Sequence, residues 1–158
     1  MGSSVGAASI LIALPGMPRL AGVIAENPMF SFQRLITESP AAPEGVPRWF
    51  NELLLGITMQ RGAFDGLLSP ASSLRLCNTT PVFFIHSKHD NVVPYQQTQE
   101  LAQLYPGPKT VWLAEDGNHG SIWDVDHGAY EKRLADFLDA ARRSREATVT
   151  TMNPKEKP

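Results

Sequence analysis

The chain has 158 residues, of which 42% are hydrophobic and 19% charged, and its net charge is −2. This is the composition of a globular protein with room for a sizeable core, and it excludes a disordered chain. The charge balance gives no basis for binding nucleic acid or an anionic membrane, and the single cysteine, Cys77, excludes an internal disulfide.

The sequence shows no targeting or membrane-spanning segment. No run approaches the roughly 20 apolar residues of a membrane span. The apolar segment SILIAL is short and has no basic flank before it, so it is not a signal peptide. The default expectation for the compartment is therefore the cytoplasm.

The chain begins with a predicted helix and a predicted strand. Residues 4–14 are small or apolar and a Pro-Gly pair ends the run, which predicts a buried helix. Residues 20–25, LAGVIA, predict a short buried strand, and residues 26–28, ENP, predict a turn.

Residues 29–76 differ in character from the rest. Prolines divide the region into pieces, and the segments 32–38 and 47–64 have helical character without strand alternation. We therefore expect a helical insert here.

The second half of the chain alternates strands with helices. Residues 81–86, PVFFIH, predict a buried strand, and residues 95–105 predict a helix. A half-buried strand is predicted over 109–114 and an amphipathic helix over 127–143.

These elements predict one partial α/β domain over residues 1–143, with the helical insert at about 29–76. Because strands alternate with helices, the sheet is expected to be parallel, with flanking helices and three visible strands. Residues 144–158 lack apolar periodicity and are predicted to form a disordered tail.

Three residues of complementary chemistry lie next to the predicted strands and helices. Ser4 precedes the first helix in GSSVG, a G-x-S-x-G pattern, while Asp90 and His119 each follow a strand. Such loops meet at one edge of a parallel sheet. A neutral imidazole can take the proton of an attacking serine, and a carboxylate fixes the imidazole tautomer. The glycines suit a sharp turn, which needs small neighbours.

On these residues the chain resembles the α/β-hydrolases of the serine esterase and prolyl-oligopeptidase-like kind, over roughly residues 2–140. GSSVGAAS resembles their nucleophile elbow, PVFFIHSKHDNVVP their acid loop and DGNHGS their histidine loop. The order Ser, Asp, His also agrees. The resemblance implies that Ser4 is the nucleophile, Asp90 the acid, His119 the base and the amide of Val5 an oxyanion donor.

The chain departs from this family in two loop positions and in its extent. Ser87 and Asn118 stand where the family often has glycine. The strands that precede the elbow, and the upstream loop that supplies a second oxyanion donor, have no counterpart in the sequence. We therefore expect the chain to be the C-terminal part of a larger hydrolase, beginning at the elbow and inactive alone.

Simpler interpretations exist for the nucleophile and the acid. Ser4 is also a favourable helix N-cap, and Asp90 lies in a composition typical of a turn. Rival acids are Glu26, which follows the first predicted strand, and Asp116 and Asp124, which flank the histidine.

The histidines also have simpler interpretations. His119 could be a loop histidine without a role, and His86, at a strand end, is expected to be a structural hydrogen-bonding residue. His89 and His127 are expected at the surface. A metal site from His86, His89 and Asp90 matches no ordinary ligand spacing.

Three aromatic residues are candidates for substrate binding. Trp49 and Phe50 lie at helical spacing with other apolar residues, which is typical of a core but also of a lid or acyl-pocket wall. Trp123, close to the histidine loop, either packs on the substrate or anchors the last helix.

The predicted function is a serine hydrolase that cleaves an ester, thioester or amide through an acyl-enzyme. The substrate is expected to be a small-molecule or peptide acyl compound with an uncharged acyl part, and no cofactor or metal is implied. An acyltransferase would use the same triad. The alternative from another class is a non-catalytic interaction module that pairs, or self-associates, through an open sheet edge.

Overall fold

The sheet is parallel and has four strands. The structure is a computed structural model that describes residues 1–40, 45–61, 68–77 and 79–152. The strands lie in the order β1-β2-β3-β4, and all neighbours are parallel. They are β1 (Gly2–Ser3), β2 (Val23–Glu26), β3 (Val82–Ser87) and β4 (Lys109–Ala114). The three predicted strands are confirmed, and β1 is additional because two residues leave no hydrophobic pattern.

Helices connect these strands. They are α1 (Val5–Ala13) with the 3-10 turn η1 (Leu14–Gly16), α2 (Phe32–Glu38), α3 (Arg48–Arg61), α4 (Pro70–Leu74), α5 (Tyr95–Leu104), α6 (Ile122–Val125) and α7 (His127–Met152). The short helices α4 and α6 were not predicted, because a single turn of helix has no periodicity to detect.

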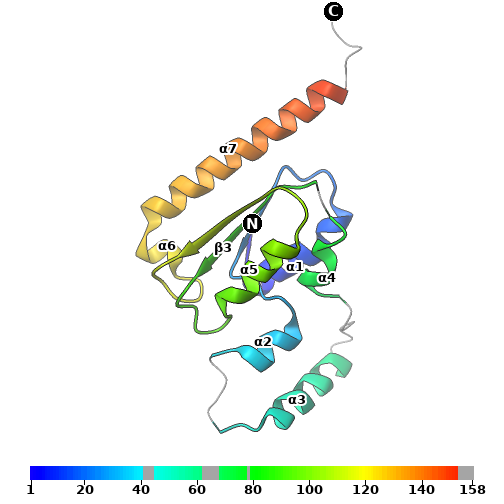
Figure 1. The fold of residues 1–158 in the computed structure, drawn as a ribbon, viewed down its shortest axis with the longest axis vertical. Helices are drawn as coiled ribbons and strands as arrows, with labels where there is room; N and C mark the ends of the chain where they lie inside the picture. The colour runs from blue at the N-terminus through cyan, green and yellow to red at the C-terminus, as the bar shows by residue number, and fades with distance from the viewer. Residues whose placement is uncertain (41–44, 62–67, 78, 153–158) are drawn as a thin grey trace, which may run out of the picture.

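Helices cover both faces of the sheet (Figure 1). Along β3, Val82 and Phe84 pack with α1, α4 and α5, whereas Phe83 and Ile85 pack with α6 and α7. Every residue of β3 is buried. A strand covered on both faces needs apolar side chains in both directions, which is why PVFFIH does not alternate.

The first helix is buried on one side only. Ala7 and Leu11 pack against the sheet, but Val5 is 62% exposed. The prediction of a helix buried all round was therefore wrong. A helix lying on a sheet meets it along one stripe, so the apolar residues on the other side of α1 face outward in the described structure.

The last helix runs further than the sequence predicted. The prediction ended it at Arg143 and expected a disordered tail after it, but α7 continues to Met152. Arg145, Glu146 and Ala147 favour a helix, and Arg142 forms an ion pair with Glu146 one turn on. The helix therefore extends without an apolar core to support it. Residues 153–158 lie outside the described residues.

The first helix of the insert is attached to the body of the domain. Arg34 on α2 binds both carboxylate oxygens of Glu100 on α5, at 2.6 and 3.0 Å. Just before α2, the backbone N–H of Phe30 donates to the side-chain oxygen of Gln97, also on α5, at 2.9 Å. These contacts, between residues 66 or more positions apart, hold α2 against α5.

The second helix of the insert has a different environment. α3 packs against α2 and lies farther from the sheet than α2 does (Figure 1). Trp49, Leu53 and Ile57 are spaced four residues apart along α3, and all three side chains are exposed. The helix predicted over 47–64 is present as α3, and residues 62–64 lie outside the described part of the chain.

Candidate active site

Ser4 lies on a strained turn between β1 and α1. Its backbone angles are φ 52° and ψ −118°, and its side chain makes no capping hydrogen bond. A non-glycine residue with this φ is uncommon, and such strain is concentrated at functional sites. Ser4 thus occupies the N-cap position of α1, but its side chain does not cap the helix. The turn projects the hydroxyl from the carboxyl end of β1 toward the histidine loop.

The two glycines of the elbow are not equivalent. A Cβ atom on Gly2 would lie 2.6 Å from the backbone of Gly6, so the strand and helix approach too closely for any side chain. A Cβ on Gly6 would meet no atom within 4 Å in the described structure. The expected need for small neighbours therefore applies to Gly2, whereas the space around Gly6 is open.

Asp90 follows β3, and its carboxylate accepts four hydrogen bonds. One oxygen accepts from the backbone amides of Val92 and Val93, both at 2.8 Å. The other lies 2.7 Å from Nδ1 of His119 and 3.1 Å from Nε2 of His86. Burial alone would raise the pKa of Asp90, but the hydrogen bonds outweigh burial and hold its pKa well below the usual range.

His86 is a buried partner of the acid. Its Nε2 faces two acceptors, the Asp90 carboxylate and the carbonyl oxygen of Val93 at 2.9 Å, so Nε2 carries the proton. Nδ1 then accepts from the hydroxyl of Thr98 at 2.6 Å. The expectation of a structural hydrogen-bonding histidine is confirmed, but its contact with Asp90 was not predicted. Their spacing of four residues was the available signal.

His119 lies between two glycines with positive φ, Gly117 at 99° and Gly120 at 72°. A Cβ on Gly117 would also come within 3.2 Å of Ile122. This tight loop places Nε2 of His119 2.9 Å from the Ser4 hydroxyl while Nδ1 contacts Asp90. The hydrogen bond to Asp90 raises the pKa of His119, against burial, and the charges of Asp90 and Glu26 raise it further.

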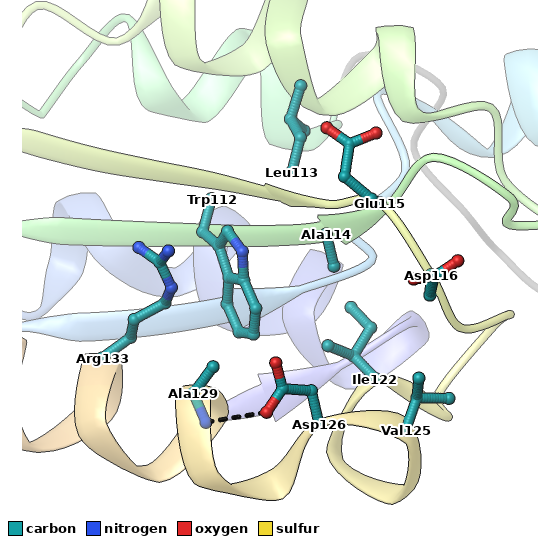
Figure 2. A pocket seen from close by; sticks show the side chains of 10 residues that line it. All are labelled: Trp112, Leu113, Ala114, Glu115, Asp116, Ile122, Val125, Asp126, Ala129 and Arg133. Atoms are coloured by element: carbon teal, nitrogen blue, oxygen red, sulfur yellow. Dashed lines mark hydrogen bonds between the residues drawn. The ribbon is translucent and has the colours of Figure 1, made fainter.

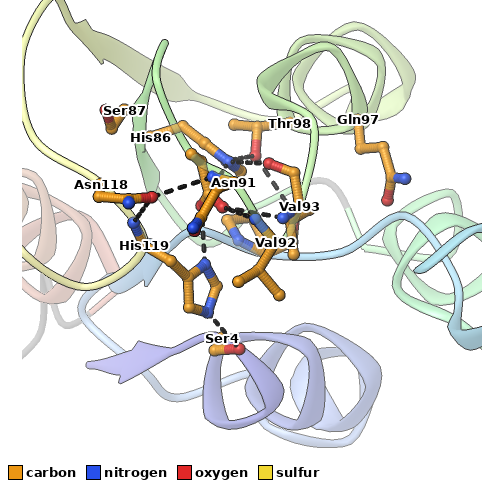
Figure 3. A network of polar contacts seen from close by, with 12 residues as sticks. Ser4, His86, Ser87, Asn91, Val92, Val93, Gln97, Thr98, Asn118 and His119 are labelled. Carbon is orange, nitrogen blue, oxygen red and sulfur yellow. Dashed lines mark hydrogen bonds and ion pairs between the residues drawn. The ribbon is translucent and has the colours of Figure 1, made fainter. Parts of the chain in front are cut away.

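The structure thus brings Ser4, His119 and Asp90 into one connected chain of hydrogen bonds (Figure 3). Because Asp90 accepts at Nδ1, that nitrogen is protonated in the neutral ring and Nε2 is free to accept from the serine. The arrangement can draw a proton from the Ser4 hydroxyl and stabilise the positive charge that forms on the imidazole.

The rival acids do not accept the hydrogen bond from Nδ1 of His119. Glu26 hydrogen-bonds with the side chains of Tyr130 and Ser3, and its burial raises its pKa. Asp116 and Asp124 are exposed. None of the three is hydrogen-bonded to His119 in the described structure, so Asp90 is the carboxylate that orients the ring.

The remaining histidines and Val5 lie where the sequence predicted. His89 and His127 are exposed. Val5 is the first residue of α1, so its backbone N–H has no acceptor within the helix. It lies at the positive, N-terminal end of the helix dipole. This N–H is therefore available beside the Ser4 hydroxyl.

The aromatic candidates are not part of the hydrogen-bonded site. Trp49 and Phe50 pack edge to face, with ring centres 5.8 Å apart, and are 65% and 40% exposed. The core interpretation of these two residues is therefore wrong. Trp123, on α6 just after the histidine loop, is 49% exposed and its ring lies 5.5 Å from that of His127. Trp123 therefore packs at the start of the last helix and still leaves about half of its surface exposed.

A separate cavity of about 460 Å³ lies beside β4 (Figure 2). Trp112 and Ala114 point into it, and Arg133 of α7 stacks over the Trp112 ring at 4.8 Å. Asp126 lines the same cavity but accepts a hydrogen bond from the Ala129 amide, so it serves the start of α7. None of Ser4, Asp90 and His119 lines this cavity, which is thus distinct from the triad.

Two other classes of site are absent from the described ranges. No group of three or more histidine, cysteine or acidic residues there is arranged to hold a metal ion. No helix in the described part of the chain has the length and apolar character needed to cross a membrane.

Comparison with known proteins places these observations in a family. A family model described as TAP-like protein, one of the α/β-hydrolase models, matches residues 68–150. The protein YqkD of Bacillus subtilis is 38% identical over 66 residues, which are 42% of this chain and 22% of that protein. The chain thus spans about a fifth of the length of the curated relatives it matches.

Solved structures resemble the whole described domain. An acylaminoacyl peptidase of Pyrococcus horikoshii has a TM-score of 0.65 at 19% identity, over 90% of this chain and 23% of that one. The esterase Pf2001 of Pyrococcus furiosus has a TM-score of 0.61 at 18% identity, over 88% of this chain and 51% of that one. At these identities the similarity shows the fold alone.

Proposed function

The chain belongs to the TAP-like family of α/β-hydrolases, and on this basis we propose that it carries the catalytic centre of a serine hydrolase. Membership of this family supports hydrolysis as the proposed activity. The observation that carries the finer proposal is the connected chain from Ser4 through His119 to Asp90, with contacts of 2.9 and 2.7 Å.

In the proposed reaction, the Ser4 oxygen attacks the carbonyl carbon of the substrate while its proton passes to Nε2 of His119. Asp90 stabilises the resulting imidazolium, and the N–H of Val5 donates to the oxyanion of the tetrahedral intermediate. His119 then returns the proton to the leaving group as the carbonyl re-forms and the acyl-enzyme is left. A water molecule, deprotonated by the same ring, releases the acyl group.

The proposed substrates are esters, thioesters or amides with an uncharged acyl part. The exposed apolar side chains of α3, Trp49 and Leu53 among them, support this choice, because α3 belongs to the insert that follows β2 at the site's edge of the sheet. Trp49, Phe50 and Trp123 are proposed to contact the acyl or leaving group. An acyltransferase would share every step except the last, where another acceptor replaces water.

The proposal includes a longer active protein. The chain covers 22% of YqkD, and the resemblance places a loop with a second oxyanion donor upstream of the elbow. Loss of one oxyanion donor costs roughly 10²- to 10³-fold in rate. Activity-based labelling of a protein translated from an upstream-extended reading frame, beside residues 1–158, tests this. Equal labelling rates for the two would contradict it.

The second candidate function is binding through a sheet edge. β1 and β4 end the strand order, so each has one backbone edge without a neighbouring strand in the described structure. Such edges pair with other chains. Light scattering over a concentration series tests self-association, and a monomer at all concentrations would argue against it.

The experiment that tests the catalytic proposal is labelling with a fluorophosphonate, which reacts with activated serines. The upstream-extended protein should label, residues 1–158 should label far more slowly, and Ser4→Ala should abolish labelling in both. Labelling that persists in Ser4→Ala would assign the nucleophile elsewhere. Failure of both the wild-type chain and the extended protein to label, with circular dichroism showing both folded, would overturn the proposal.

A further inference from the structure

Two loops carry the acid and the base: the acid loop, residues 87–93, and the histidine loop, residues 115–121. They leave two paired strands, since β3 and β4 are in register up to Ser87 and Ala114. The last backbone bond between them runs from the N–H of Lys88 to the carbonyl of Ala114, at 2.9 Å. Beyond this bond, no backbone hydrogen bond joins the two loops in the described structure, so side chains have to fix the position of one loop relative to the other.

Ser87 supplies the first cross-link. Its buried hydroxyl donates to the carbonyl oxygen of Gly117 at 2.7 Å. The same oxygen accepts from the backbone N–H of His89 at 3.1 Å. One hydroxyl therefore binds the residue before Asp90 in the acid loop and the residue two positions before the base.

Asn118 supplies the second cross-link. Its side-chain oxygen accepts from the backbone N–H of Asn91, in the acid loop, at 3.0 Å. It also accepts from the N–H of His119 at 2.8 Å. Both partners are donors, so the oxygen and not the NH₂ group of the amide has to face them. One amide oxygen therefore binds the residue after the acid and the base itself.

The two cross-links bind the residues on either side of the acid in the chain, His89 and Asn91, and Figure 3 shows the bond between Asn91 and Asn118. We propose that Ser87 and Asn118 form a two-point clamp between the acid loop and the histidine loop, and that this clamp sets the distance from Asp90 to His119. Both are positioning residues, since neither contacts the serine. The inference rests on the proposed function for its catalytic meaning, whereas the geometry of the clamp does not depend on it.

A third link between the same loops provides a matched control. Lys88 and Glu115 form an ion pair at 2.5 Å, with exposed side chains. Exposed pairs contribute little, because water and salt screen them. Glu115→Gln therefore removes a link between these loops without touching the clamp.

The test uses the full chain and two readouts. One is the fluorophosphonate labelling rate. The other is the low-field proton resonance of His119 Nδ1, which reports the hydrogen bond to Asp90 and requires no catalysis. Asn118→Ala should reduce the labelling rate roughly tenfold and weaken or abolish the resonance, because a small misplacement of the base is costly. Asn118→Asp keeps acceptor oxygens and should restore both.

Asn118→Ala and Ser87→Ala leave unchanged the charged groups that face His119, which are Asp90 and Glu26. Glu115→Gln should retain the wild-type rate within about twofold. Ser87→Ala tests the other point of the clamp by the same readouts, should Asn118→Ala fold poorly. A merely structural role would lower the melting temperature and leave the resonance of the folded protein in place.

The outcomes separate the two proposals. If neither residues 1–158 nor the upstream-extended protein labels, but the Nδ1 resonance is present and is lost in Asn118→Ala, the clamp stands and the hydrolase proposal fails. Unchanged rate and resonance in Asn118→Ala and Ser87→Ala would overturn the clamp. An equal loss in Glu115→Gln would overturn it as well, since any link between the loops would then suffice.

Discussion

The loops that carry the triad and the helix α3 of the insert are held in opposite ways. At the triad, both oxygens of Asp90 have two partners each, and His119 is fixed at both ring nitrogens. α3 instead rests on α2 and leaves Trp49 and Leu53 exposed. The catalytic side chains are thus held in fixed positions by hydrogen bonds, whereas α3, which is proposed to contact the acyl group, makes few contacts with the rest of the domain in the described structure. Substitutions at the first region should change rates, and those at the second should change substrate preference.

The largest effect should come from Asp90→Asn. The Val92 and Val93 amides would retain the amide oxygen, so the NH₂ group would face Nδ1 of His119, which favours the wrong tautomer and leaves Nε2 unable to accept from Ser4. We expect the labelling rate to fall roughly 10⁴-fold. Stopped-flow or gel-based labelling measures it, with circular dichroism as the control for folding. A loss below tenfold would show that another carboxylate orients the ring.

Gly2→Ala should have the next largest effect. The new Cβ would lie 2.6 Å from the backbone of Gly6, so the elbow has to shift, and we expect a loss of labelling of roughly 10²-fold. Gly6→Ala is the matched comparison, because its Cβ meets nothing within 4 Å in the described structure. Similar losses in the two variants would mean that close approach is not the cause.

The pH dependence should report the surroundings of His119. Only the neutral ring accepts the serine proton, so the labelling rate should rise with pH through an apparent pKa above the ordinary 6.5. Glu26→Gln removes a charge that raises this pKa, and should move the midpoint to lower pH. Rate profiles from pH 5 to 9 measure both. A midpoint that does not move in Glu26→Gln would show that the charge of Glu26 does not affect the pKa of His119.

The smallest effect should be that of Trp49→Ala. With an ester of a long uncharged acyl chain, we expect KM to rise about threefold while kcat stays unchanged, since only binding is affected. Leu138→Ala removes another exposed apolar side chain, on α7, and is the control. Equal effects of the two substitutions on KM would show that α3 does not contact the substrate.

Much of the fold was visible in the sequence because its strands leave distinct hydrophobic patterns: β3 is buried on both faces, whereas the edge strand β4 is partly exposed. PVFFIH and KTVWLA gave the positions of β3 and β4, and the residue types after them indicated Asp90 and His119. The extension of α7 was missed because an exposed helix that leaves the core has no apolar stripe.

The contacts around the triad were harder to predict. His86 reaches Asp90 only because the chain turns back sharply after Ser87, so that Val93 lies beside the strand end. The cross-link from Asn118 likewise depends on two loops that are 27 residues apart in the chain. Such contacts follow from loop conformation, which neither composition nor periodicity encodes.

Two backbone amides that donate to the Asp90 carboxylate, those of Val92 and Val93, can report whether this carboxylate is charged. While Asp90 is ionised, the amides of Val92 and Val93 should exchange slowly with deuterated solvent. Because the pKa of Asp90 is lowered in the folded chain, its contribution to stability is complete above the ordinary value of 3.8 and is lost as the pH falls through the lowered pKa. Mild acid should therefore leave this loop closed, and only strong acid should open it to exchange.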